Sequence, residues 1–312
     1  MFRSLIVTPV LVTMMFATLI PVAGHAQNAA ATPGQKAVLV TGASTGIGRK
    51  ITERLAADGY FVYAGARKPA DLEALGAIKN VQPVKLDVAR QSDIDAAVGV
   101  ITKAGRGLYG LVNNAGIATI GTATETSDAE FTLLMDVNLF GPYRVTRAFA
   151  PLIIASKGRI TTIGSLSGIV ATRDLTAYSM SKHAMEAFAD SLAAQMEPLG
   201  VQANIVEPGN YDTDIGKNLS VRSGQQSRLA DRSQYPKPDE VAVAVEQALF
   251  EANPKRRYLV VPNQKEAEIT LRKQIEQLVQ LNEGHRYTYD RDALVKMLDE
   301  AMAKARPRVA GK

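Results

Sequence analysis

A tyrosine and a lysine stand four residues apart in Tyr178-Ser-Met-Ser-Lys182, at the start of an apolar helical pattern. Residues i and i+4 share one face of a helix, so the phenol and the ammonium can approach the same bound molecule. The ammonium favours the phenolate form of a neighbouring tyrosine, which suits Tyr178 to general acid/base chemistry. Such a pair is also common in ordinary amphipathic helices, so its meaning depends on the rest of the sequence.

A glycine-rich turn at residues 41–48 is the second chemical signal, because it separates a short apolar run from a helical pattern. Its glycines follow the order Gly-x-x-x-Gly-x-Gly rather than the commoner Gly-x-Gly-x-x-Gly. Such a turn lets backbone N–H groups approach a pyrophosphate, which the helix N-terminus then stabilises. The candidate binding residues of the turn are Gly42, Ser44, Thr45, Gly46, Ile47 and Gly48.

The same turn also fits a second kind of site. Residues 42–46 read Gly-x-Ser-x-Gly, the nucleophile elbow of α/β-hydrolases. In a serine hydrolase Ser44 would attack an ester, with His183 or His285 as the base. The elbow would follow the first core strand, which leaves no earlier strand and loop to supply an oxyanion hole. The hydrolase is therefore the weaker of the two interpretations.

Composition leaves few other routes to chemistry. The 312 residues contain no Cys, which excludes disulfides, thiolate catalysis and Cys-ligated metals. The three His are too scattered in sequence for a His-built metal centre. Apolar residues at 46% and charged residues at 21% are typical of globular proteins and argue against general disorder. The net charge of +5 helps attract phosphorylated ligands but does not predict a nucleic-acid partner.

The first 26 residues match the pattern of a secretory signal peptide. Arg3 precedes an uncharged, mostly apolar run, and Gly24 and Ala26 place small residues at a cleavage site. Residues 27–35 then form a linker. The alternative is an uncleaved anchor, since the run approaches the roughly 18 residues that span a bilayer. We expect export to the periplasm or beyond, with a membrane-anchored or cytoplasmic protein as the alternatives.

Short apolar runs alternate with helical patterns along residues 36–263. Strands are expected at residues 37–40, 60–66, 84–86, 108–112, 159–163, 201–206 and 258–261. Ser92 is expected to cap a helix that reaches Ala104. The alternation predicts a single α/β domain with a doubly wound, Rossmann-type parallel sheet. Residues 264–312 are charged and helical in pattern, and are expected to form a helical tail.

The glycine turn and the Tyr178–Lys182 pair, in this order along the chain, resemble motifs of the short-chain dehydrogenase/reductase family. The resemblance covers residues 36 to about 262. Three further segments match landmarks of its cofactor site. Asp87 and Val88 match the segment that contacts the adenine, and residues 113–116 match the turn that approaches the ribose. Residues 208–213 resemble the loop that holds the nicotinamide carboxamide. The cofactor residues implied by these three matches are Asp87, Val88, Asn114, Ala115, Gly116, Pro208, Gly209 and Thr213.

The resemblance also implies a reaction, the transfer of a hydride between a nicotinamide cofactor and a carbonyl or secondary alcohol. Tyr178 would give the proton to the substrate oxygen, which Ser165 would orient and polarise. Lys182 would bind the cofactor ribose and support Tyr178, and Asn138 would connect Lys182 to solvent through a water molecule. The resemblance further implies a small-molecule substrate and a homodimer or homotetramer.

The end of the second expected strand indicates which cofactor is used. NAD sites usually carry a carboxylate there, which binds the ribose 2′-hydroxyl. Here residues 63–70 contain no carboxylate, and Arg67 and Lys68 stand in its place. A guanidinium suits the 2′-phosphate of NADP, so we expect NADP rather than NAD.

The substrate is not readable from the sequence. Residues 211–235 follow the Pro-Gly loop and, by resemblance, cover the substrate. Arg222, Arg228 and Arg232 could recognise an anion there, or could only keep the segment solvated. A noncatalytic nucleotide-binding protein also stays open, although it would not need both Tyr178 and Lys182.

Overall fold

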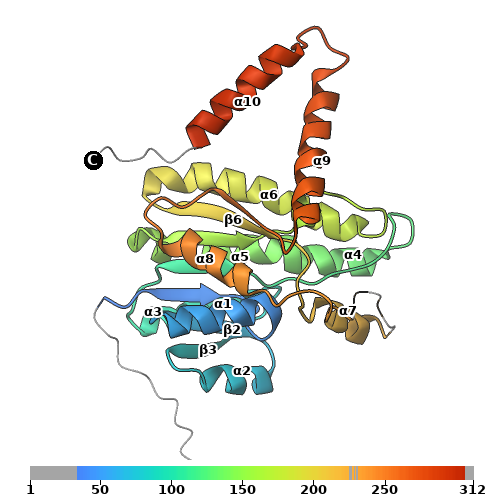
Figure 1. Ribbon diagram of the computed structural model, residues 1–312. Coiled ribbons are helices and arrows are strands. Elements are labelled where there is room, and N and C mark those ends of the chain that lie inside the picture. Colours follow the sequence, from blue (N-terminus) through green and yellow to red (C-terminus); the bar gives the residue numbers. More distant parts are fainter. Residues whose placement is uncertain (1–33, 225–226, 228, 230, 306–312) are drawn as a thin grey trace, which may run out of the picture. The chain divides into compact units, whose positions relative to one another are not determined.

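The computed structural model describes residues 34–224, 227, 229 and 231–305, and a seven-stranded parallel sheet lies at its centre (Figure 1). The strand order is β3-β2-β1-β4-β5-β6-β7, so the order reverses between β1 and β4. The strands are β1 (Ala37–Val40), β2 (Phe61–Ala66), β3 (Val81–Lys85), β4 (Gly110–Asn113), β5 (Arg159–Ile163), β6 (Gln202–Pro208) and β7 (Arg257–Val260). The expected doubly wound α/β sheet is confirmed.

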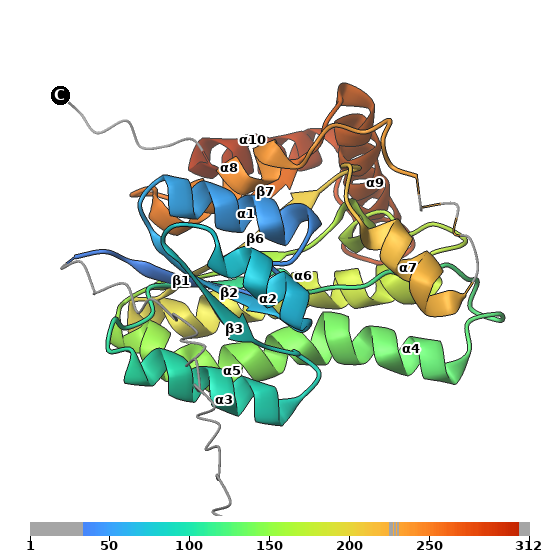
Figure 2. The same ribbon diagram turned by 90° about the horizontal axis from the view of Figure 1, so that it is seen from below.

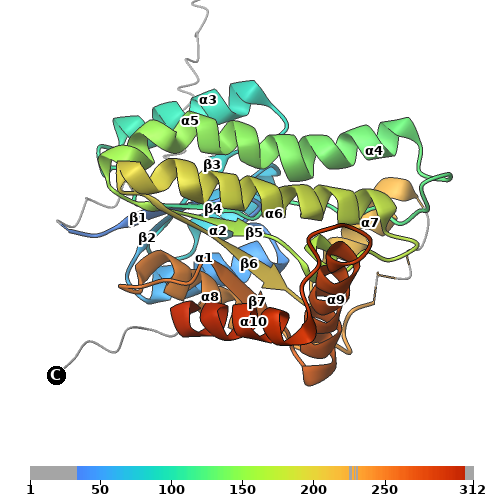
Figure 3. The ribbon, with the colours of Figure 1, turned by 90° about the horizontal axis from the view of Figure 1, so that it is seen from above.

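Helices cover both faces of the sheet (Figures 2 and 3). One layer consists of α1 (Gly46–Ala57), α2 (Pro69–Gly76) and α8 (Asp239–Phe250). The other layer consists of α3 (Gln91–Lys103), α4 (Asp128–Met135), α5 (Gly141–Ala155) and α6 (Thr176–Met196). The remaining helices are α7 (Ile215–Ser223), α9 (Gln264–Asn282) and α10 (Arg291–Ala305), with the short turns η1 (Asp136–Phe140), η2 (Leu166–Gly168) and η3 (Glu197–Leu199).

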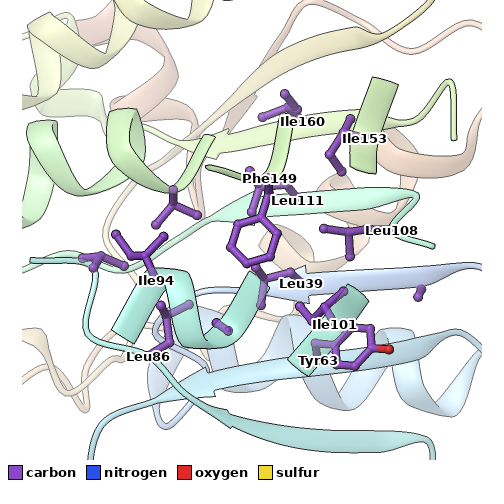
Figure 4. Close-up of a cluster of buried hydrophobic side chains, with 14 of the residues drawn as sticks. Leu39, Tyr63, Leu86, Ile94, Ile101, Leu108, Leu111, Phe149, Ile153 and Ile160 are labelled. Carbon is purple, nitrogen blue, oxygen red and sulfur yellow. The ribbon is translucent and has the colours of Figure 1, made fainter. Parts of the chain in front are cut away.

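The period of the strands explains why the sheet is buried on both sides. Along β1, Ala37 and Leu39 join the core beneath α3, α5 and α6, whereas Val38 and Val40 join the core beneath α1 and α8. Successive side chains of a strand point to opposite faces, so a fully apolar strand needs helices on both sides. Figure 4 shows the first of these cores, in which Phe149 of α5 packs over Leu39 and Leu111.

The third strand and the start of the third helix differ from what the sequence predicts. The third strand is longer than expected, because its first three residues pair with β2 although they are only half-buried. Ser92 does not cap α3, which begins one residue earlier at Gln91 with Arg90 as its N-cap, so that expectation was wrong.

The helical tail is present as α9 and α10. The expected leader and linker lie in residues 1–33, outside the described part, except for Gly34 and Gln35. Within the described residues, no helix is both long enough and apolar enough to cross a bilayer.

Candidate active site

A cavity of about 590 Å³ opens at the carboxyl ends of the strands and collects nearly all of the sequence-derived candidates. Ser165, Tyr178 and Lys182 line this cavity together with every expected cofactor residue. Those cofactor residues are Gly42, Ser44, Thr45, Gly46, Ile47, Gly48, Arg67, Asp87, Val88, Asn114, Ala115, Gly116, Pro208, Gly209 and Thr213. Asn138 is outside the lining and is buried. In open α/β sheets the crevice at the reversal of strand order is where ligands bind.

Hydrogen bonds join the two loops at this reversal, after β1 and after β4. The Thr41 hydroxyl accepts from the backbone N–H groups of Asn114 and Ala115, at 2.9 and 3.0 Å. In return, the Asn114 side-chain amide donates to the carbonyl oxygens of Thr41 and Gly42, at 2.8 and 3.1 Å. The glycine turn and the Asn114 turn therefore form one hydrogen-bonded unit.

Two glycines of the turn stand where a larger residue would not fit. Their surroundings show whether the turn suits a dinucleotide. A Cβ at Gly48 would lie 2.3 Å from the Asn114 amide nitrogen and 2.3 Å from the Gly42 carbonyl oxygen. Gly42 itself has a φ of +64°, a conformation that favours glycine. These two glycines thus let the start of α1 pack closely against the Asn114 turn at the cavity wall, and a helix N-terminus in that place suits a pyrophosphate. The residues present fit a dinucleotide.

Tyr178 and Lys182 lie on the first turns of α6 and both face the cavity. Lys182 is only 8% exposed, and its Nζ donates a 2.9 Å hydrogen bond to the Ile163 carbonyl oxygen at the end of β5. The same nitrogen lies 5.8 Å from the centre of the Tyr178 ring. The ammonium is therefore held against the end of β5 beside the Tyr178 ring, at the wall of the cavity.

Ser165 approaches the same space from the loop after β5. It precedes the short turn η2, and its hydroxyl oxygen accepts from the Ser167 N–H at 3.1 Å. A serine hydroxyl can still donate its proton when the oxygen accepts one hydrogen bond. Ser165 can therefore still donate to a ligand bound in the cavity, which Tyr178 also lines.

Asn138 stands behind the cavity in the π-helical turn η1, between α4 and α5. Its side chain is paired with both backbone groups of Ile117, at 2.8 and 2.9 Å, and donates to the Ser181 hydroxyl at 3.1 Å. Ser181 in turn donates to the Tyr178 carbonyl oxygen at 2.7 Å. Asn138 thus connects the segment after β4 to the turn of α6 that carries Tyr178, while its role in a water relay stays a prediction.

The first turn of α9 fixes the loop after β6, a contact that sequence reasoning missed. The Glu266 carboxylate accepts from the Asn210 backbone N–H at 2.9 Å and from its side-chain amide at 3.2 Å. A Cβ at Gly209 would lie 2.1 Å from a Glu266 carboxylate oxygen, so a larger residue there would displace the carboxylate. The expected tail therefore helps to shape the cavity wall. The only sequence signal was the Asn263–Glu266 pair at the helix start, where Asn263 accepts from the Glu266 N–H.

The arginines of the segment after β6 fall in different places. Arg222 and Arg232 line the cavity, whereas Arg228 lies outside the described part of the chain. Arg232 donates to the Tyr211 carbonyl oxygen at 2.8 Å and to the Asn210 side chain at 3.0 Å. Sequence reasoning raised both residues only as general anion sites, because the segment shows no regular pattern.

The geometry does not support a serine hydrolase among the described residues. Ser44 lines the cavity, but His183 and His285 do not. His183 is exposed on α6 and pairs with the Ser179 carbonyl oxygen, and His285 lies beyond α9 beside Tyr287. Neither of the two histidines in the described ranges is therefore in place to take the proton of Ser44. The described residues also contain no group of His, Asp or Glu arranged to hold a metal ion.

A buried pair of carboxyl groups lies behind the active-site loops. The side chains of Glu186 on α6 and Glu207 on β6 are only 13% and 3% exposed, and Arg257 of β7 donates to both. Arg257 also pairs with Asp190 of α6 at 2.6 Å. Burial, followed by the charge and hydrogen bond of Glu207, raises the pKa of Glu186 to about 8, against the opposing effect of Arg257. The folded protein therefore holds a proton on this pair at neutral pH.

The proton on the Glu186–Glu207 pair makes the stability of the protein depend on pH. The folded state keeps it up to about pH 8, whereas the unfolded chain releases it near its ordinary pKa of 4.5. The free energy of unfolding should therefore fall as the pH rises between these values. Glu186→Gln should make this fall shallower, as measured by urea unfolding at several pH values. The control is Glu268→Gln on exposed α9, and identical pH profiles for wild type and Glu186→Gln would contradict the assignment.

A family model and a curated relative both match this chain. Residues 36–223 match the family model described as short chain dehydrogenase. The mitochondrial D-beta-hydroxybutyrate dehydrogenase of Bos taurus is 39% identical over 206 residues, which cover 62% of this chain and 60% of the relative. The chain thus spans less than two thirds of the length of that curated relative.

Two solved structures share the fold. A short-chain dehydrogenase from Streptomyces avermitilis is 27% identical, with a TM-score of 0.70 over 81% of this chain and 97% of the other. Actinorhodin polyketide ketoreductase, solved with NADPH, is 25% identical, with a TM-score of 0.66 over 74% of this chain and 98% of the other.

Proposed function

The chain belongs to the short-chain dehydrogenase/reductase family, and from this premise we propose that it is an NADP-dependent oxidoreductase of carbonyl compounds and secondary alcohols. One observation carries the proposal: a single cavity holds Tyr178, Lys182 and Ser165 together with a glycine turn in which Gly42 and Gly48 have no room for a Cβ. The matched relatives named above are dehydrogenases or a ketoreductase.

Each of the three side chains has one task in the proposed reaction. When bound, the dinucleotide exchanges a hydride with the substrate carbon. During reduction Ser165 donates a hydrogen bond to the carbonyl oxygen and polarises it. Tyr178 transfers its phenolic proton to that oxygen, which becomes the hydroxyl oxygen of the alcohol product, and the buried Lys182 ammonium stabilises the phenolate that remains. Oxidation runs through the same groups in reverse.

The NADP preference rests on the residues after β2. Arg67 and Lys68 line the cavity and are exposed, and the first carboxylate after β2 is Asp71, within α2. Arg67→Gln should raise the KM for NADPH by about tenfold or more, because a charged hydrogen bond contributes about 1.5–3 kcal/mol. The KM for NADH should change little, because NADH lacks the 2′-phosphate. Initial rates with both cofactors check the prediction, and equal losses for NADPH and NADH would contradict it.

The activity can be tested with a panel of ketones, aldehydes and secondary alcohols, followed by nicotinamide absorbance. We expect turnover with at least one carbonyl or alcohol and a preference for NADPH. Binding of NADPH without oxidation by any compound in the panel would instead favour a noncatalytic nucleotide-binding protein.

Two further proposals concern assembly and location. We propose a homodimer or homotetramer that forms through α4, α5 and α6, and exposed apolar side chains on or beside these helices support it. They are Leu133, Phe140, Tyr143 and Met180. We also propose export directed by residues 1–26, for which sequencing the N-terminus of the mature protein is the test.

A further inference from the structure

Arg222 reaches across the cavity from the last turn of α7. Its guanidinium donates to the Ala118 carbonyl oxygen and, at 3.4 Å, to the Thr119 hydroxyl. Ala118 follows the Asn114 turn after β4, so these contacts join α7 to the opposite wall of the cavity. Arg222 is half-buried and is itself part of the cavity lining.

Within the described part of the chain, no ion pair balances the positive charge of Arg222. The hydrogen-bond acceptors of its guanidinium there are a carbonyl and a hydroxyl, neither of which carries a charge. Burial lowers the pKa of Arg222, nearby Glu130 raises it, and Arg67 lowers it again. A half-buried guanidinium without a carboxylate partner has lost part of its hydration, and an anion that binds beside it would offset that loss.

The lining of the cavity as a whole carries more positive than negative side chains. Its charged lining consists of Arg67, Lys68, Lys182, Arg222 and Arg232 against Asp71, Asp87 and Asp214. Asp214 is further neutralised by Lys217, whose Nζ lies 3.2 Å away. Arg67 follows β2 and Arg222 lies on α7, and both residues line the cavity. Guanidinium groups suit phosphate because their N–H donors match its oxygens in pairs.

We propose that Arg222 binds a phosphate group of the dinucleotide from α7, opposite Arg67, and so determines cofactor affinity from the segment that covers the substrate. The inference rests on the proposed function, because it takes the dinucleotide as the ligand. The phosphate is either the 2′-phosphate of the adenosine or the pyrophosphate. Occupancy by either group would hold α7 against the segment after β4.

Three nucleotides without nicotinamide can test Arg222 in the full chain. Adenosine 2′,5′-bisphosphate and AMP differ only in the 2′-phosphate, and ADP and AMP differ only in the second phosphate of the 5′ chain. Calorimetry with wild type and Arg222→Gln should show that the variant loses about tenfold in affinity for one of the two doubly phosphorylated probes. The probe that loses affinity relative to AMP identifies the phosphate.

Two further variants control for folding and for general charge. Lys103→Gln removes a charge from the exposed end of α3, outside the cavity lining, and should leave all three affinities unchanged. Arg222→Lys keeps the charge without the paired donors and should lose less affinity than Arg222→Gln. Unchanged affinities for all three nucleotides in Arg222→Gln would overturn the inference. Since no probe undergoes hydride transfer, failure of the proposed activity would show separately, as absent turnover with intact binding.

Discussion

Replacement of Tyr178 by phenylalanine should lower kcat by about 1000-fold or more while NADPH still binds. In the proposed reaction the phenol, which lines the cavity, gives its proton to the substrate oxygen, and general acid catalysis contributes about 100- to 10,000-fold. The ring itself stays, so its packing on the first turn of α6 is kept. The measurement combines kcat, for the best substrate of the panel, with calorimetric titration of NADPH.

Tyr143→Phe is the matched control, because Tyr143 is exposed on α5 and does not line the cavity. It should leave both kcat and NADPH affinity at wild-type values. If Tyr178→Phe kept a rate within a few-fold of wild type, Tyr178 would not be the acid/base, whatever else the cavity binds.

The second large effect is expected at Gly48, where alanine should weaken NADPH binding by at least about tenfold and lower stability. Its Cβ would meet the Asn114 amide nitrogen and the Gly42 carbonyl oxygen, both at 2.3 Å. Overpacking of a tight site costs about 1–3 kcal/mol, and the hydrogen bond between these two groups would have to break. Calorimetric titration with NADPH and thermal unfolding measure the two effects.

Gly99→Ala provides the control for the glycine substitution. Gly99 lies within α3, and a Cβ there would have no neighbour within 4 Å. Alanine is the better helix former by about 1 kcal/mol, so this variant should be as stable as wild type or more stable. Wild-type NADPH affinity in Gly48→Ala would show that the glycine turn is not the nucleotide cradle.

Sequence reasoning succeeded where short segments carry their own signal. The apolar strands, the glycine turn at residues 41–48 and the Tyr178–Lys182 spacing are all local, and a parallel sheet brings its strand ends together at one edge. Once the alternation of strands and helices had been read, the cavity followed from topology. It contains each expected site residue except Asn138.

The missed features depend on contacts between distant parts of the chain. Glu266 meets Asn210 across 56 residues, and Arg222 meets Ala118 across 104. Neither pairing has a periodic pattern, because a loop contributes one partner in each. The buried Glu186 resembled an ordinary polar position of α6 until β6 and β7 placed Glu207 and Arg257 against it.

The N-cap of α3 was predicted at Ser92, whereas Arg90 holds that position. Ser92 is a good cap by residue type, but the helix begins one residue ahead of it at Gln91. In α4 and α9 the capping residues Ser127 and Asn263 do accept from the third helical N–H. Residue type alone therefore places a helix start to within a residue or two, which is the usual uncertainty of helix ends.

The central claim is that this chain transfers a hydride between nicotinamide and a carbonyl carbon with Tyr178 as the proton donor. The most direct test supplies NADPH with deuterium at the transferred position of C4 to the full-length protein and the best carbonyl of the panel. The account predicts one deuterium on the carbinol carbon of the product, formed by wild type and by Tyr143→Phe but not by Tyr178→Phe. Product without deuterium, or label transfer that persists in Tyr178→Phe, would contradict it.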